Sequence, residues 1–144
     1  MRPARAADLA AVESLVHDAY EPWIEVVGMR PVPMEADYGA LIAAGLVHVT
    51  DGLEGLIVLV PEDGVLLVDN VAVRPESHGK GIGRGLLAFA EEEARRLGLP
   101  ALRLYTNVKM ATNIALYTSL GYVETGREGI KGRSAVLMRK ELSS

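Results

Sequence analysis

The stretch 71–87, VAVRPESHGKGIGRGLL, constrains the fold of this chain more than any other part of it. It reads as an apolar strand that ends before Pro75, then a polar glycine-rich turn, then the first turns of an amphipathic helix. Glycine lets the backbone approach a ligand closely, and the first turn of a helix leaves N–H groups unpaired and carries partial positive charge. With His78, Lys80 and Arg84 nearby, the stretch predicts a site for a phosphate-bearing ligand.

Two common nucleotide-binding motifs fit this stretch poorly. A Walker P-loop requires Lys-Ser or Lys-Thr after its glycine loop, and the sequence has neither here. Residues 83–88, GRGLLA, nearly match a dinucleotide fingerprint, but roughly ten residues separate them from the preceding strand. The next expected strand, with residues 102–107 reading LRLYTN, also lacks the acidic residue that such a site needs. The sequence therefore supports both nucleotide motifs only weakly.

Residues 78–83, HGKGIG, resemble motif A of the GCN5-related N-acetyltransferase (GNAT) family, which runs Gln or Arg, two residues, Gly, one residue, and Gly or Ala. His78 stands in place of the usual Arg or Gln, while the glycine spacing is kept. A second family motif, Asn with a Leu-Tyr pair and then Gly-Phe or Gly-Tyr, resembles residues 113–117, NIALY, and 120–122, LGY. The two motifs occur in the family's order, and the resemblance covers nearly the whole chain, being weakest from about residue 20 to residue 38.

The resemblance implies an α/β (α+β) fold of the GNAT acyl-CoA N-acyltransferase type, with a mixed central β-sheet of about six to seven strands flanked by about four helices. It also implies that residues 1–144 form one acetyltransferase domain, which suits the length of the chain. The expected order of elements is the family's: a strand, two helices, three strands, a helix, a strand, a helix and two strands. Periodicity alone predicts only a mixed α/β sheet.

Apolar periodicity, turn residues and helix-capping residues set the expected elements. Asp8 is the expected N-cap of the first helix, because an aspartate in that position accepts hydrogen bonds from the first turn. The expected helices cover residues 9–20, a short stretch within 21–33, 37–44, 83–97 and 111–120. The expected strands cover residues 1–5, 46–50, 55–60, 65–73, 101–106, 122–127 and 134–140.

Composition narrows the classes of function. A net charge of −4 argues against general binding to nucleic acid or to a membrane surface, and no apolar run approaches the length of a membrane span. The N-terminal residues lack the apolar core of a signal peptide, so we expect a cytoplasmic protein. The chain has no cysteine, which excludes disulfides and a cysteinyl acyl-enzyme. Because no His, Asp or Glu cluster has metal-ligand spacing, we expect no metal.

Through the resemblance, coenzyme A becomes the expected phosphate ligand and acetyl-CoA the expected acyl donor. The backbone of residues 79–84 would hold the pyrophosphate in a nest of N–H groups, and residues 71–73 would pair with the pantetheine arm as with an added strand. In the family this strand usually carries a bulge, which the sequence does not reveal. The expected cofactor-contacting residues are Val71, Ala72, Val73, His78, Gly79, Lys80, Gly81, Ile82, Gly83, Arg84 and Asn113.

Asn113 and Tyr117 are spaced i and i+4, so on a helix they face the same side. By resemblance, Asn113 hydrogen-bonds the cofactor, and Tyr117 protonates or stabilises the departing thiolate. A phenol suits this role because its reference pKa of about 10 keeps it protonated at neutral pH. The alternative reading of Tyr117 is a tyrosine of the apolar core.

The acceptor amine must be neutral to attack a thioester, yet a lysine-like amine is neutral only about once in two or three thousand molecules at pH 7. A general base or an acceptor of lower pKa is therefore needed. Asp69 is the leading candidate base because it lies on the strand that presents the thioester, although a structural role is an equally open reading. Strand alternation places Asn70 on the opposite face, so only one of these two residues is expected in the cleft. Weaker candidates are Glu25, Glu35 and His48.

The resemblance implies an N-acetyltransferase that moves an acetyl group directly from acetyl-CoA to a primary amine within a ternary complex. The alternative is a non-catalytic acyl-CoA-binding sensor or interaction module that keeps only the cofactor site. The resemblance permits a homodimer, and we expect no nucleic-acid or membrane partner. Four residues between the first helices lie where the family builds its acceptor pocket, although packing explains them equally well: Trp23, Met29, Met34 and Tyr38.

Overall fold

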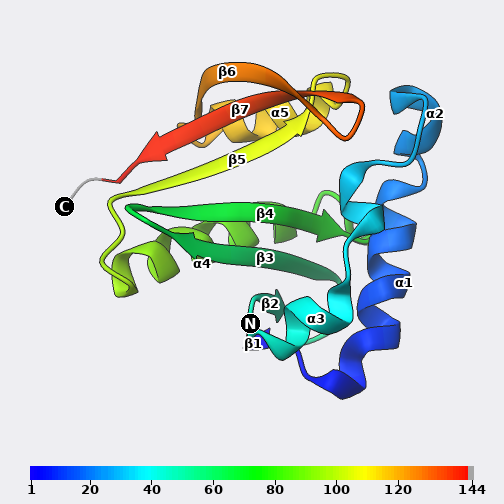
Figure 1. The fold of residues 1–144 in the computed structure, drawn as a ribbon. Helices are drawn as coiled ribbons and strands as arrows, with labels where there is room; N and C mark the ends of the chain where they lie inside the picture. Colours follow the sequence, from blue (N-terminus) through cyan, green and yellow to red (C-terminus); the bar gives the residue numbers. More distant parts are fainter. Residues whose placement is uncertain (143–144) are drawn as a thin grey trace.

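A seven-stranded mixed sheet forms the centre of the fold in our computed structural model, which describes residues 1–142 (Figure 1). Its strands stand in the order β1-β2-β3-β4-β5-β7-β6, and within the described residues β4 and β5 are the only parallel neighbours. The strands are β1 (Arg2–Pro3), β2 (Val47–Val49), β3 (Gly55–Glu62), β4 (Val65–Val73), β5 (Ala101–Asn107), β6 (Val123–Ile130) and β7 (Arg133–Glu141). The helices are α1 (Leu9–Tyr20), α2 (Trp23–Val27), α3 (Tyr38–Ala43), α4 (Ile82–Arg96) and α5 (Ala111–Ser119), with short 3₁₀ turns η1 (Ala6–Asp8), η2 (Val32–Glu35) and η3 (Pro75–Ser77).

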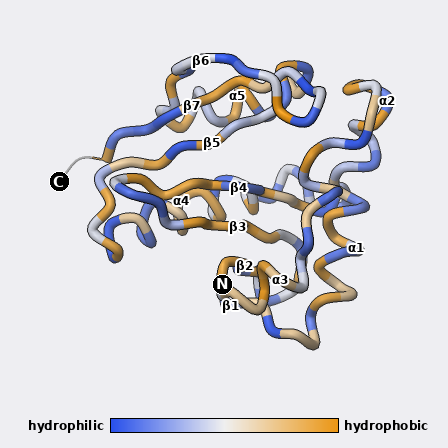
Figure 2. The backbone as a smooth tube through the Cα atoms, viewed as in Figure 1, coloured by the Kyte–Doolittle hydropathy of each residue, from blue (hydrophilic) through white to orange (hydrophobic). Residues whose placement is uncertain are grey.

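Helices cover both faces of the sheet (Figure 1). α1 and α3 pack on one face, in a core cluster that includes Leu15 and Leu56. α4 and α5 pack on the other face, in a cluster that includes Leu86 and Leu102. Figure 2 shows that β3 and β4, which lie between the two layers, are largely hydrophobic, as expected for strands buried on both faces.

The expected fold class and order of elements are confirmed. Every expected helix and strand is present, and the ends differ from expectation by at most three residues, as at the end of β6. The ambiguous stretch 21–33 contains the short helix α2 and a loop that leads into η2. Among the described residues, no helix is both long enough and apolar enough to cross a membrane.

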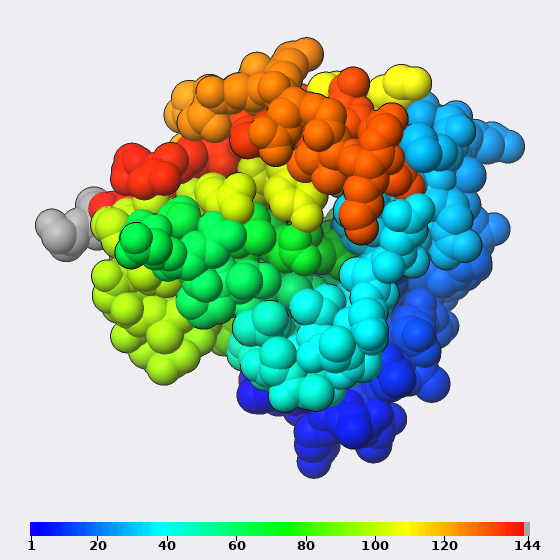
Figure 3. All heavy atoms as spheres, viewed as in Figure 1, coloured from blue at the N-terminus to red at the C-terminus, as the bar shows by residue number. Residues whose placement is uncertain are grey.

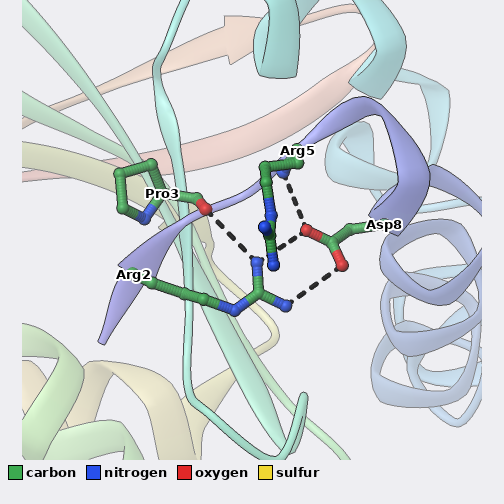
Figure 4. A network of polar contacts seen from close by, with 4 residues as sticks. All are labelled: Arg2, Pro3, Arg5 and Asp8. Atoms are coloured by element: carbon green, nitrogen blue, oxygen red, sulfur yellow. Dashed lines mark hydrogen bonds and ion pairs between the residues drawn. The ribbon is translucent and has the colours of Figure 1, made fainter.

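The carboxylate of Asp8 ties β1 to the start of α1 (Figure 4). The Arg2 guanidinium donates to both oxygens of Asp8, at 2.7 and 3.1 Å, and the Arg5 backbone N–H donates to Oδ2 at 2.7 Å. These hydrogen bonds, that from Arg2 above all, hold the pKa of Asp8 well below its usual range. The expected N-cap is confirmed, since Asp8 stands at the N-cap of α1. Its side chain accepts from Arg2 and Arg5, however, and from nothing in the first turn of that helix.

A β-bulge interrupts β4 at Asp69. Val58 of β3 pairs with Asn70, and the next residue, Leu59, pairs with Val68, so Asp69 has no partner on β3. β4 therefore has one more residue than β3 at this point. Such an extra residue changes the direction in which the following side chains of the strand point. The bulge that the family resemblance implies is thus present in this chain.

The bulge reverses which side chains of β4 face which helices. Before it, Val68 packs in the cluster of α4; after it, Val71 and Val73 pack against that same cluster. Ala72 instead joins the cluster of α1. Because strand side chains normally alternate with a period of two, a spacing of three between Val68 and Val71 requires the extra residue.

The pairing between β4 and β5 stops beside the bulge. It covers Leu66 to Val68 on β4 and Leu102 to Leu104 on β5, and beyond these residues the two strands diverge (Figure 1). From Asp69 onward, the edge of β4 that faces β5 has no strand beside it within the described residues. Its N–H and C=O groups are therefore open to another extended chain.

We expect Gly55→Ala to destabilise the fold, because β3 and α4 approach closely at this glycine. An added Cβ would lie 2.9 Å from Cγ2 of Ile82 and 3.2 Å from the carbonyl oxygen of Ala72. Overpacking of this kind lowers the free energy of unfolding by about 1–3 kcal/mol, which urea denaturation measures. Gly85→Ala in α4 is the matched control, since no atom of the described residues lies within 4 Å of that added Cβ. It should leave stability unchanged or raise it by about 1 kcal/mol through helix propensity, and equal losses in both variants would contradict the packing argument.

The five tyrosines of the chain predict a loss of stability at alkaline pH. Burial raises the pKa of each one, because it disfavours the phenolate. Below pH 10 or so, both the native and the unfolded chain keep their phenol protons. Above it, the unfolded chain loses phenol protons that the native chain retains, so the free energy of unfolding falls. The fall is up to about 1.4 kcal/mol per tyrosine per pH unit, and it ends once the pH passes the native pKa values. Urea denaturation at increasing pH measures this fall, and tyrosinate absorbance appearing near pH 10 in the folded protein would show the prediction to be wrong.

Candidate active site

The loop between β4 and α4 forms an anion-binding turn. Gly79 and Gly81 have φ angles of 82° and 77°, in the left-handed region that favours glycine, and Gly81 is the N-cap of α4. The first hydrogen bond of the helix runs from the Gly85 N–H to the Gly81 carbonyl, at 3.0 Å. The N–H groups of residues 81–84 precede this bond, so they remain available to a ligand at the positive end of the helix dipole.

A groove of about 520 Å³ runs from this loop along the free edge of β4 to α5; we call it the donor groove. It is lined by every expected cofactor-contacting residue except Lys80: Val71, Ala72, Val73, His78, Gly79, Gly81, Ile82, Gly83, Arg84 and Asn113. Trp23, one of the residues expected where the family builds its acceptor pocket, lines this groove. Ala19 and Tyr20 at the end of α1 line it too, and no local motif marked them.

The charged side chains of the loop have different roles. The Lys80 ammonium lies 3.6 Å from Oε2 of Glu54 and outside the donor groove. The ring of His78 lies in the groove, with Nε2 3.3 Å from the Val73 carbonyl, so it links the loop to the end of β4. Arg84, in the first turn of α4, lines the groove and places a full positive charge beside the free N–H groups.

A second hollow, the inner chamber, continues from the donor groove into the space where β4 and β5 diverge. It shares Tyr20, Val71, Asn113 and Tyr117 with the groove. Asp69 and Asn70 both line it, so the expectation that only one of them faces the cleft is wrong. The bulge at Asp69 is the reason, because it breaks the alternation on which that expectation rested.

A third hollow of about 180 Å³, the outer hollow, opens beyond the inner chamber. The two share six lining residues: Val32, Pro33, Asp69, Asn70, Tyr105 and Ile130. In Figure 3 the surface is hollowed between the orange-to-red turn that joins β6 to β7 and the cyan segment around η2. The donor groove, inner chamber and outer hollow therefore follow one another through the gap between β4 and β5.

Tyr117 lies where the donor groove meets the inner chamber. It stands one helical turn after Asn113 on α5, and its side chain packs edge-on against Tyr122, with ring centroids 5.9 Å apart. Burial raises the pKa of Tyr117 to about 12. Its hydroxyl makes no hydrogen bond to another side chain or carbonyl of residues 1–142, so it is a protonated donor free to meet a ligand.

Asp69 is held by a tyrosine that the sequence analysis missed. The Tyr105 hydroxyl, on β5, donates to Oδ1 of Asp69 at 2.7 Å across the gap between the strands. Burial and the neighbouring Asp69 carboxylate raise the pKa of Tyr105, so the phenol keeps its proton. One oxygen of Asp69 is thereby fixed, and the carboxylate has a defined orientation in the inner chamber.

Asn70 is the centre of a buried hydrogen-bond chain behind the bulge. Its side-chain oxygen accepts from the Tyr20 hydroxyl, which also lies 3.0 Å from the Val71 carbonyl. Its amide nitrogen donates to the Tyr38 hydroxyl at 2.9 Å, and Tyr38 donates to the Pro33 carbonyl at 2.6 Å. The chain ties α1, α3 and the start of η2 to the bulge. A lone Asn in an apolar strand is the sequence signal that could have pointed to it.

The weaker candidate bases lie elsewhere. Glu35 accepts a hydrogen bond from Arg133 at 2.8 Å, which lowers the pKa of Glu35. His48, on β2, packs against Phe89 of α4 with ring centroids 4.9 Å apart, and burial lowers its pKa. Neither residue, nor Glu25, lines the donor groove or the inner chamber. In residues 1–142, no group of three or more His, Asp or Glu side chains is placed to hold a metal ion.

Comparison with known proteins gives the same family as the motifs. Residues 38–124 match the family model described as acetyltransferase (GNAT) domain. The chain is similar to the IAA acetyltransferase of Azospirillum brasilense, with 44% identity over 78 residues that make up 54% of this chain and 51% of that protein. It is also similar to the ribosomal protein bS18-alanine N-acetyltransferase of Escherichia coli strain K12, with 40% identity over 55 residues, 38% of this chain and 37% of that protein. The chain thus aligns with about half or less of the length of these relatives.

Among solved structures, the fold is similar to that of the PaiA N-acetyltransferase of Thermoplasma acidophilum, which was solved in complex with coenzyme A. The TM-score is 0.81, the match covers 98% of this chain and 97% of the other, and the sequence identity is 19%. At that identity, the likeness establishes the fold alone. Because the family model matches more than half of the chain, and the expected motifs lie together in the expected fold, this chain belongs to the GNAT acetyltransferase family.

Proposed function

We propose that this chain is an N-acetyltransferase that passes an acetyl group directly from acetyl-CoA to a primary amine, within one catalytic domain formed by residues 1–144. The observation that carries the proposal is the position of Tyr117, a protonated phenol between the donor groove and a chamber that contains a carboxylate. Two relatives named as N-acetyltransferases or acetyltransferases, and a similar fold solved with coenzyme A, support it. We keep a cytoplasmic location and a possible homodimer as predictions.

The donor groove suits coenzyme A in three ways. The free N–H groups of residues 81–84 and the Arg84 guanidinium favour a pyrophosphate. The unpaired edge of β4 from Asp69 to Val73 suits the amides of the pantetheine arm, which can pair with it as an added strand does. The groove then leads to Tyr117, so a thioester at the end of the arm reaches the inner chamber.

In the proposed reaction, the neutral acceptor amine attacks the thioester carbonyl, and a C–N bond forms as the C–S bond breaks. The sulfur leaves as a thiolate, which the Tyr117 hydroxyl protonates; the phenolate then regains its proton from solvent. The proton lost by the acceptor nitrogen passes to Asp69, directly or through water, and Asp69 then releases it to solvent. Because the chain has no cysteine, no cysteinyl intermediate forms, and the proposed direct transfer has both substrates bound together.

The first experiment measures release of free coenzyme A from acetyl-CoA with a panel of amines, for the wild type and for Tyr117→Phe. Loss of the hydroxyl should slow turnover by about 10²-fold with nearly unchanged acetyl-CoA affinity, because the phenol acts in the transition state. Tyr122→Phe is the control: it removes a buried hydroxyl that has no hydrogen-bond partner in the described structure and lies outside the groove. Normal turnover of Tyr117→Phe would refute its role as the acid. Tight binding of acetyl-CoA without transfer to any amine or peptide would favour the non-catalytic binding module.

A second prediction concerns the glycine loop. Gly81→Val should abolish binding of coenzyme A, because a side chain with φ near 77° distorts the turn that aims the N–H groups of α4 at the ligand. Gly98→Val is the matched control, since Gly98 also has a positive φ, 71°, and open space around it, but lies at the far end of α4. Both variants carry similar strain, so thermal denaturation should show similar losses. Calorimetry should then find coenzyme A binding in Gly98→Val alone; binding retained in Gly81→Val would contradict the nest of N–H groups.

A further inference from the structure

The mouth of the outer hollow, where the exposed Lys131 lies, carries a positive charge in a chain whose net charge is −4. Arg30, Lys131 and Arg133 all lower the pKa of Glu35, the one carboxylate among them. These four residues come from two distant segments: Arg30 and Glu35 from the stretch that leads into η2 and ends it, and Lys131 and Arg133 from the turn between β6 and β7 and the start of β7. Of these four residues, Lys131 lines the outer hollow and Arg133 lines the inner chamber.

Arg133 is fully engaged in holding the two segments together. Its side chain is 6% exposed, and it donates to the Arg30 carbonyl, to the Lys131 carbonyl at 2.6 Å and to Glu35 at 2.8 Å. A buried guanidinium with these partners has little charge left for a ligand. The Arg133–Glu35 pair thus links the start of β7 to the end of η2.

Lys131, in contrast, is free to meet a ligand. It is exposed, it lines the outer hollow, and it forms no ion pair with any residue in 1–142. Lys131 and Gly132 form the two-residue turn between Ile130 and Arg133, with φ angles of 49° and 79°. Such turns prefer Asn-Gly, and a lysine is an uncommon residue at the first position. The turn therefore places a long cationic side chain at the mouth at some cost in backbone strain.

The inner end of the outer hollow has the opposite charge. Asp69 lines both the outer hollow and the inner chamber, and Tyr105 fixes one of its oxygens at 2.7 Å. The wall between Asp69 and Lys131 is largely apolar, with Val32, Pro33 and Ile130 among its residues. A molecule in this hollow meets a carboxylate on the side of the thioester and an ammonium on the side of the solvent.

We propose that the acceptor is a small amphoteric molecule, with a primary amine at one end and a carboxylate or phosphonate at the other. The inference rests on the proposed function and names the substrate class of that same site. Asp69 draws the amine inward to the thioester, and Lys131 binds the acid group at the mouth, so the two charges orient the acceptor for attack. A diamine of similar length meets Lys131 with a like charge and is disfavoured. The hollow of about 180 Å³ suits a molecule with a few heavy atoms.

The test compares acceptors of matched length: β-alanine, aminoethylphosphonate, propylamine and diaminopropane. Release of free coenzyme A gives kcat/KM for each one. We expect β-alanine or aminoethylphosphonate to exceed propylamine by about tenfold or more, the size of one hydrogen-bonded charge contact, and diaminopropane to be the slowest. The first two acceptors distinguish a carboxylate site from a phosphonate site.

The variant Lys131→Asn removes the charge and supplies the residue that this turn prefers, so the hairpin remains folded. It should lower kcat/KM for the acidic acceptor about tenfold, mainly through KM, and leave propylamine unchanged. Lys131→Arg should restore the preference, and Lys109→Asn, which removes an exposed charge outside all three hollows, should change neither acceptor.

The outcomes separate the two proposals. Equal kcat/KM for β-alanine, aminoethylphosphonate and propylamine, or an unchanged preference in Lys131→Asn, would overturn the amphoteric acceptor while the acetyltransferase proposal stands. Failure of the wild type to acetylate any amine or peptide, with acetyl-CoA bound, would overturn the proposed function and this inference with it.

Discussion

The structure depends on one interruption of strand pairing, the bulge at Asp69. A single unpaired residue reverses the side-chain alternation of β4, so that Val71 and Val73 pack against the helix that carries the donor groove. At the same place the pairing with β5 ends, which leaves an open strand edge and a gap through the sheet. The donor groove, the inner chamber and the outer hollow all border this gap. Continuous pairing to the ends of β4 and β5 would close all three.

An opening through the middle of a sheet removes backbone hydrogen bonds, and side chains replace part of them. Tyr105 bridges the strands by donating to Asp69, and Asn70 joins the bulge to α1 and α3 through two tyrosine hydroxyls. Further out, Arg133 connects the β6–β7 turn to the segment before η2. These side chains are buried or half-buried, and each is hydrogen-bonded. Polar groups satisfied in this way stabilise one arrangement of a protein interior. The same contacts that hold the gap open also orient the carboxylate inside it.

Local signals in the sequence were sufficient for most of the fold and for the residues that line the donor groove. The strand, glycine turn and helix of the donor groove are consecutive in the chain, and glycines with positive φ and a helix N-terminus mark them directly. The bulge was out of reach, because it exists only in the register between β3 and β4. Tyr105, Arg133 and Lys131 were missed for a similar reason: each acts on a residue from a distant segment. The ion pairs of Lys80 with Glu54 and of Asp8 with Arg2 likewise had no signal in the local sequence.

The residues that local sequence signals marked lie mostly within the range that the family model matches. Several residues that depend on distant contacts lie outside that range. The family model covers residues 38–124, which include β4, the glycine loop, α4 and α5, and therefore the donor groove except its α1 and α2 wall. The outer hollow takes Val32, Pro33, Ile130 and Lys131 from outside that range. The part of the site that the family model covers is thus the part that we assign to the donor. The acceptor has to be read from this chain's own residues, and there the charges of Asp69 and Lys131, at opposite ends of one hollow, are the most specific feature.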